Sequence, residues 1–146
     1  MKKNSGKQSE AMFENALTRM YGKRVFIHRL QDAQALHGMN GHAVKVGKQH
    51  ADYILTISGV GSFYAEVKSS LNKTSFPLSS IKSHQLAAAR QIRIAGGKYY
   101  FFVHNLATDT FYMVDSAEVD RVAKTRSSLR WDDYEPWKEY ESYKGK

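Results

Sequence analysis

The sequence contains no cysteine among its 146 residues. This absence excludes disulfide scaffolds, zinc sites built from thiolates, iron–sulfur clusters and cysteine nucleophiles. No run approaches the roughly 18 consecutive apolar residues that a membrane span requires, and no apolar segment follows the polar, basic opening. We therefore expect a cytoplasmic protein without a membrane partner or an export signal.

Proline-rich linkers, low-complexity tracts and internal repeats are also missing. A chain of 16.6 kDa with 42% hydrophobic residues can bury one core and has little room for a second. We therefore expect a single domain over residues 1–146. Within it we distinguish a basic, flexible start at 1–8, a mobile loop at 31–50 and an aromatic extension at 127–146 that packs on the domain or on a dimer partner.

Acidic residues are few: 14 Asp and Glu stand against 22 Lys and Arg, for a formal charge of +8. This balance is typical of a protein that binds a polyanion, so nucleic acid is the first partner to consider. A basic surface that only aids solubility is the alternative. The residues predicted to contact DNA are Lys2, Lys3, Lys7, Lys45, Lys48, Lys73, Lys82, Arg90 and Arg93.

Hydrophobic periodicity predicts alternating helices and strands. Helices are expected at 9–21, at about 79–95 and at 117–124, and strands at 25–28, 52–57, 63–68, 99–104 and 111–114. Ser9 is the expected cap of the first helix, and Ser79 or Ser80 that of the second, whose buried stripe would hold Ile81, Ala88 and Ile92. This order describes an α/β domain with a central mixed sheet flanked by helices.

One strand carries a pattern with chemical meaning. Side chains alternate along a strand, so Glu66 and Lys68 share one face of the sheet. The hairpin folds Asp52, at the head of the partner strand, back toward them. Two close carboxylates repel each other unless a cation lies between them, and oxygen ligands suit Mg²⁺ or Mn²⁺. The pattern indicates a metal site for phosphodiester hydrolysis, although on its own it also describes a solvated sheet face.

Several segments resemble one nuclease family. The strand pair Ala51-Asp52-Tyr53 and Phe63–Lys68 is similar to the PD-(D/E)xK nuclease superfamily. Within it, the run through Asn72–Leu78 and Ser83-His84-Gln85 resembles the RecU-like Holliday junction resolvases. Ala11–Glu14 resembles the start of the first helix of the same family. The resemblance covers roughly residues 9 to 115.

The resemblance implies a restriction-endonuclease-like fold and a homodimeric, Mg²⁺-dependent endonuclease, with Mn²⁺ able to substitute. Its substrate would be branched DNA, a four-way junction cut by paired nicks that leave 5′-phosphate and 3′-hydroxyl ends. By match to the family motif, Asp52 and Glu66 would bind the metal with Val67, and Lys68 would position the water. Glu14 would support the metal site, and Gln85 would lie beside it.

Two further groups of residues have open interpretations. His37, His42 and His50 lack the spacing of a zinc site, so phosphate contact or solvation is expected. The aromatic row from Trp131 to Tyr143 is expected to pack on the domain or a dimer partner, because interleaved acids disfavour base stacking. As alternatives to junction resolution we keep a nuclease acting on other branched, single-stranded or duplex DNA, and a non-catalytic DNA-binding module.

Overall fold

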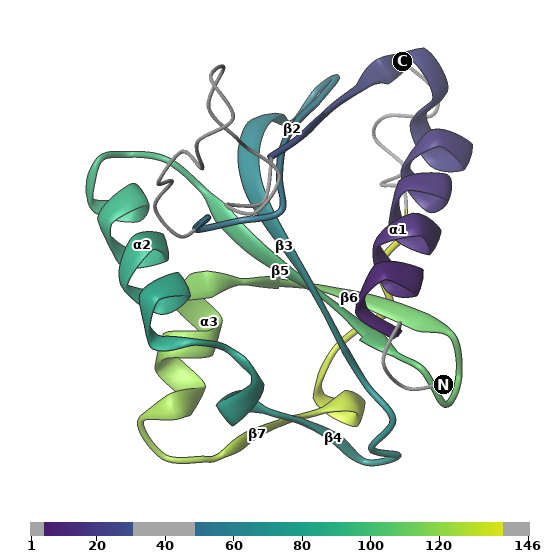
Figure 1. The fold of residues 1–146 in the computed structure, drawn as a ribbon. Helices are drawn as coiled ribbons and strands as arrows, with labels where there is room; N and C mark the ends of the chain where they lie inside the picture. Colours follow the sequence, from purple (N-terminus) through teal and green to yellow (C-terminus); the bar gives the residue numbers. More distant parts are fainter. Residues whose placement is uncertain (1–4, 31–48, 139–146) are drawn as a thin grey trace, which may run out of the picture.

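The computed structural model describes residues 5–30 and 49–138. Its helices and strands follow the predicted order (Figure 1). They are α1 (Ser5–Tyr21), β1 (Val25–Arg29), β2 (Tyr53–Ile57), β3 (Gly61–Ser70), β4 (Ser75–Pro77), α2 (Ser83–Ile94), β5 (Tyr99–Asn105), β6 (Thr110–Asp115), α3 (Ser116–Ala123) and β7 (Ser128–Arg130). Short 3-10 turns lie at η2 (Gly22–Arg24), η4 (Leu78–Ser80) and η5 (Trp131–Asp133).

The centre of the fold is a five-stranded sheet in the order β1-β2-β3-β5-β6. Strands β3 and β5 are parallel and are connected through α2, whereas the other neighbours are antiparallel. Helix α1 covers one face of the sheet, and α2 and α3 cover the other (Figure 1). The sheet is therefore mixed and flanked by helices, and the predicted α/β fold of a small nuclease-like domain is confirmed.

Two apolar cores lie on the two faces of the sheet. The core under α1 contains Phe13 and Phe102, and the core under α2 and α3 contains Phe101. Adjacent residues of β5 enter opposite cores because side chains alternate along a strand. Trp137 completes the α1 core, with its ring centroid 5.5 Å from that of Phe13. Trp131 is buried in the other core, so both tryptophans of the predicted aromatic extension pack on the domain.

The first helix begins earlier than predicted. It starts at Ser5, so residues 5–8, expected to belong to the flexible start, are helical, and residues 1–4 lie outside the described part of the chain. Ser9 is fully buried inside the helix and does not cap it. Its Oγ lies 2.7 Å from Nδ1 of His104 on β5, a contact that ties α1 to the sheet. The predicted cap was wrong because the helix starts at Ser5, which leaves Ser9 inside it. The bond of Ser9 to a residue 95 positions away could not be foreseen from the local sequence.

The second helix begins later than predicted. The backbone turns through η4 at Leu78–Ser80 and is extended at Lys82, so α2 starts at Ser83. The cap is made by Gln85, whose Oε1 accepts a hydrogen bond of 3.1 Å from the Lys82 backbone N–H. Of the predicted stripe, Ile81 is buried in the core but precedes the helix, and Ile92 packs partly against the core, whereas the buried residues of the helix itself are Gln85 and Ala89. The sequence analysis also missed the small sheet of β4 and β7, whose three-residue strands show too little periodicity.

Candidate active site

Asp52 lies at the start of β2, held by the neighbouring strands. Its backbone N–H donates to the carbonyl of Ala65 at 3.0 Å, and its carbonyl accepts from the Leu30 N–H at 2.8 Å. Its side-chain Oδ2 accepts a hydrogen bond of 2.8 Å from the backbone N–H of Val67. The hairpin thus places this carboxylate directly against β3, and it brings together two of the three predicted metal ligands, Asp52 and Val67.

Glu66 is buried in the middle of β3, with 6% of its surface exposed. Its Oε2 accepts a hydrogen bond of 2.8 Å from Nε2 of Gln85 and lies 3.5 Å from Nζ of Lys68. Ala65 and Val67, on either side of it in sequence, enter the α1 core. The predicted alternation therefore holds, and Glu66 and Lys68 share the face covered by α2.

Gln85 connects the start of α2 to the carboxylate of Glu66 on β3. Its Oε1 accepts from the Lys82 N–H, which turns its Nε2 toward Glu66. One amide therefore both caps the helix and orients the buried carboxylate. Because the amide is 6% exposed and both of its ends are bonded, its orientation is fixed before any substrate arrives.

The two carboxyl groups hold protons more tightly than ordinary ones. Burial raises the pKa of Asp52 to about 6, although the hydrogen bond from Val67 and the nearby Lys68 charge oppose the rise. Burial, together with the charge of Asp52, raises the pKa of Glu66 to about 8 against the opposing effects of Lys68 and Gln85. Two buried carboxylates that repel each other form a pair that a cation would stabilise in its ionised state.

The donor set fits a hard cation. Asp52 Oδ2 and Glu66 Oε2 are engaged by protein donors, whereas no residue in the described ranges donates a hydrogen bond to Asp52 Oδ1 or Glu66 Oε1. No group of three or more Asp, Glu, His or Cys side chains suited to a metal occurs within residues 5–30 and 49–138. Two carboxylates with remaining positions for water and phosphate are what Mg²⁺ usually takes.

Glu14 lies in a neighbouring cluster on the α1 side of the sheet. Its Oε2 accepts hydrogen bonds from Tyr53 OH at 2.6 Å and from Arg29 Nη1 at 3.2 Å. Arg29 also pairs with Glu10 Oε1 at 2.5 Å. Burial and then the bond to Glu14 raise the pKa of Tyr53. The structure thus joins Glu14 to the residue after Asp52, and it gives no direct contact between Glu14 and the two buried carboxylates.

Sequence reasoning missed three residues around the site. Arg29 lowers and Glu10 raises the pKa of Asp52 through their charges. Tyr99 lies near both carboxylates, and its hydroxyl donates to the carbonyl of His50. Glu10 is one helical turn before Glu14, a spacing that could have suggested a paired role. Nothing in the sequence signals Tyr99, because its place follows from the parallel pairing of β3 with β5.

The basic residues predicted to contact DNA fall into three groups. Lys73, after β3, and Lys82, before α2, are exposed near the ends of the elements that carry Glu66 and Gln85, and Lys7 is exposed on α1. Arg90 and Arg93 instead form ion pairs of 3.1 and 2.7 Å with Asp120 of α3. Lys2, Lys3, Lys45 and Lys48, together with His37 and His42, lie outside the described residues, as do Tyr140 and Tyr143.

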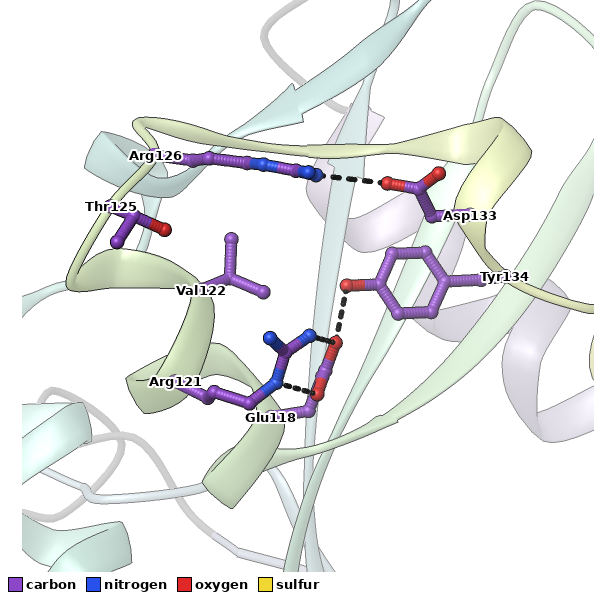
Figure 2. Close-up of a pocket in the computed structure, with 7 residues that line it drawn as sticks. All are labelled: Glu118, Arg121, Val122, Thr125, Arg126, Asp133 and Tyr134. Carbon is purple, nitrogen blue, oxygen red and sulfur yellow. Dashed lines mark hydrogen bonds and ion pairs between the residues drawn. The ribbon is translucent and has the colours of Figure 1, made fainter.

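A separate pocket of about 360 Å³ lies between α3 and the segment around η5 (Figure 2). Its charges are paired internally: Arg121 pairs with Glu118 at 2.7 Å and Arg126 with Asp133 at 3.0 Å. Tyr134 OH donates to Glu118 at 2.9 Å. Because each guanidinium already has a carboxylate partner, the pocket is not an obvious anion site, and it shares no lining residue with the Asp52 and Glu66 pair.

A comparison of the sequence with known protein families gives one match. The sequence profile of a family described as Recombination protein U matches residues 23–136. The chain belongs to the Recombination protein U family. This is a family of Holliday junction resolvases, so the suspected RecU-like identity is confirmed, together with a role in DNA recombination. The matched range contains Asp52, Glu66, Lys68 and Gln85, whereas Glu14 precedes it.

One other comparison and one structural observation complete the description. No curated protein matches the chain. In the described part of the chain, no helix has the length and the apolar character needed to cross a lipid bilayer. Membership of a resolvase family therefore rests on the family profile, and it supports an endonuclease.

Proposed function

We propose that this chain is a cytoplasmic, Mg²⁺-dependent DNA endonuclease that resolves four-way junctions by paired nicks, with Mn²⁺ able to replace Mg²⁺. The observation that carries the proposal is that Asp52, Glu66, Lys68 and Gln85 lie together between β3 and α2, with Glu66 and Gln85 buried. Such a set of perturbed carboxyls beside a lysine is expected at a catalytic centre. Membership of the Recombination protein U family supports the four-way junction as the substrate.

The carboxylates of Asp52 and Glu66, with the backbone of Val67, would hold the Mg²⁺ ion. When bound, Mg²⁺ supplies positive charge that stabilises the charge developing on the attacked phosphate. Gln85 donates a hydrogen bond to Glu66 Oε2, which would leave Oε1 for the ion. The Val67 N–H likewise donates to Asp52 Oδ2, which would leave Oδ1 for the ion.

Lys68 would position the attacking water. Its Nζ is 3.5 Å from Glu66 Oε2, and its side chain is 15% exposed, so it can reach a water beside the carboxylates. The water oxygen bonds to phosphorus as the bond from phosphorus to the 3′ oxygen breaks. The water loses its proton and the departing oxygen gains one, which leaves a 5′-phosphate and a 3′-hydroxyl. Glu14 would contribute by holding Tyr53 and Arg29 beside Asp52.

We further propose that the enzyme acts as a homodimer. A four-way junction presents two opposed strands related by twofold symmetry, and each protomer contains one site. A twofold dimer would therefore present one site to each strand. The basic surface with Lys73 and Lys82 near the site would contact the phosphates of the junction arms.

The test places purified protein with Mg²⁺ on an end-labelled immobile junction and on a linear duplex of matched sequence, and maps the cuts on every strand. Paired nicks on opposed strands of the junction, with the duplex intact, are expected. Equal cutting of both substrates would instead establish a general nuclease. Salt-sensitive binding without cutting, with Mn²⁺ also tried, would establish a DNA-binding module.

A further inference from the structure

A groove of about 480 Å³ lies beside the carboxylate pair, between α2 and the start of β3. It is separate from the pocket in Figure 2, with which it shares no residue. Among the described residues that line it there is no Asp, Glu, Lys or Arg. Its walls combine rings, an amide and aliphatic side chains, namely His50, Tyr64, His84, Gln91, Ala88 and Ile92.

The rings of the groove are held in place by the fold. Tyr64 stacks on the fully buried Tyr99, with centroids 6.3 Å apart and planes 11° apart. The imidazoles of His50 and His84 lie 6.1 Å apart. The carbonyl of His50 accepts a hydrogen bond from Tyr99 OH, so the same buried tyrosine supports two walls of the groove.

The groove shares its backbone with the proposed catalytic site at three points. Tyr64 is two residues before Glu66 on β3, so both side chains lie on the same face, about 7 Å apart along the strand. His50 is two residues before Asp52, and His84 directly precedes Gln85. A DNA strand whose phosphate lies at the carboxylates would therefore have its neighbouring nucleotide at the groove.

We propose that this groove receives one unstacked nucleobase of the strand being cut, adjacent to the phosphate held at Asp52 and Glu66. This inference rests on the proposed function. An uncharged groove lined by rings and aliphatic groups does not attract phosphate, but it suits a flat base, which stacks on aromatic side chains regardless of its identity. Unstacking a base from a duplex costs a few kcal/mol and costs less where the helix is disturbed, and the branch point is the place in a junction where regular stacking is interrupted.

Gln91 gives the groove a means to discriminate between bases. Its side chain is exposed on α2 at the groove, and no residue of the described ranges bonds to its amide. An amide offers one acceptor and two donors, which is the pattern that reads base edges. We assign to Gln91 the sequence preference at the cut, and to Tyr64 and His84 the stacking that is independent of sequence.

The experiment compares intact junctions with junctions that lack one base at successive positions on either side of the cut. For the wild type, one abasic position is expected to lower the cleavage rate by roughly tenfold, which is the scale of a lost stacking contact. The His84→Ala variant is expected to cut the intact junction roughly tenfold more slowly than the wild type. Removing the base at the sensitive position should lower the cleavage rate of this variant little further. Gln8→Ala, an exposed change on α1, serves as the matched control and should behave as wild type.

Gln91→Ala tests the second assignment on a junction that can branch-migrate through several sequences. We expect the cuts to spread over more sites while total cleavage is kept. Unchanged cut positions would overturn the role of Gln91, and an abasic series without a sensitive position would overturn the groove as a base site, in both cases with cleavage intact. A wild type that does not cut the junction would overturn the proposed function and this inference together.

Discussion

Nε2 of Gln85 lies 2.8 Å from Oε2 of Glu66, while Oε1 of the same amide caps α2. The hydrogen bond opposes the rise of the Glu66 pKa, which burial and the charge of Asp52 nevertheless bring to about 8. A single side chain therefore links the start of a helix to the ionisation of the carboxylate that we assign to the metal.

Replacing Gln85 tests this link. In Gln85→Ala, the lost bond raises the pKa of Glu66 further, so the rise of the cleavage rate with pH should move to higher pH. The lost cap should also lower the free energy of unfolding by about 1 kcal/mol. Rate profiles between pH 6 and 9 and denaturant unfolding measure the two effects. An unshifted profile with unchanged stability would contradict both roles of the amide.

Removing either carboxylate should stop the chemistry and spare binding. Glu66→Gln or Asp52→Asn is expected to lower cleavage by at least about a thousandfold, because one of the two acidic ligands is lost. Junction affinity should stay the same or increase, since a negative charge near phosphate is removed. Glu135→Gln and Asp132→Asn change the same charge at exposed positions and provide the controls. Retained cutting in the first pair would refute the site.

Stability without divalent cations should fall as pH rises. The folded pKa values of about 6 for Asp52 and about 8 for Glu66 exceed their ordinary values of 3.8 and 4.5, so the folded state binds protons more tightly. This contribution is complete below about pH 4 and is lost by about pH 8, at about 1.4 kcal/mol per pKa unit.

Thermal unfolding in EDTA between pH 4 and 9 measures that loss. Other groups titrate in the same range, so the informative quantity is the difference between wild type and Glu66→Gln, whose stability should fall less steeply. Adding Mg²⁺ at pH 8 should raise the melting temperature of the wild type, since the ion binds the folded state. Equal pH dependence in both proteins would show that Glu66 has an ordinary pKa.

Glu14 should matter less than the buried pair. Its carboxylate bonds to Tyr53 and Arg29, so Glu14→Gln disturbs the support of Asp52 and leaves both carboxylates in place. We expect cleavage to fall by no more than about tenfold, with a fall in apparent Mg²⁺ affinity that higher Mg²⁺ concentrations offset. Kinetics over a range of Mg²⁺ concentrations measure both. A thousandfold loss at saturating Mg²⁺ would assign Glu14 to the metal site itself.

Basic residues that are exposed should affect DNA binding, whereas those paired within the protein should affect stability. Lys73 and Lys82 are exposed, so Lys73→Ala and Lys82→Ala should each weaken junction binding and reduce its salt dependence by about one ion. Hydrogen bonds from Arg93 and Arg90 lower the pKa of Asp120 although burial raises it, so all three charges are engaged within the protein. Asp120→Asn should lower the melting temperature by a few degrees and leave cleavage unchanged.

Much of the fold could be predicted from the sequence because its strongest signals are local. The hairpin around Gly59 and Gly61 follows from the turn sequence, since both glycines adopt positive φ values of 82° and 100°. The side-chain alternation of β3 placed Glu66 and Lys68 on one face. The start of α1 was wrong because Ser9 bonds to a residue on a distant strand, and the start of α2 was wrong because the cap is a glutamine rather than a serine.

The candidate site could be predicted only in part. The spacing of Asp52, Glu66 and Lys68 relies on a hairpin and a strand, which are local structures. The position of Gln85 depends on how α2 crosses from β3 to β5, and only the family resemblance indicated it. Tyr99 and Arg29 escaped prediction because they reach the site through the order of strands in the sheet, which periodicity does not encode.

The contact between Phe13 and Trp137 has a consequence for folding during synthesis on the ribosome. Trp137 also binds the sheet through its backbone N–H, which donates to the carbonyl of Phe111 at 2.7 Å. The two rings are separated by 124 positions (137 minus 13). At about 5–20 residues per second, translation takes roughly 6–25 seconds to travel that distance. During that time the aromatic surface of Phe13 and Phe102 lacks its last ring, so a nascent chain stalled before residue 137 should be the form that chaperones and proteases engage.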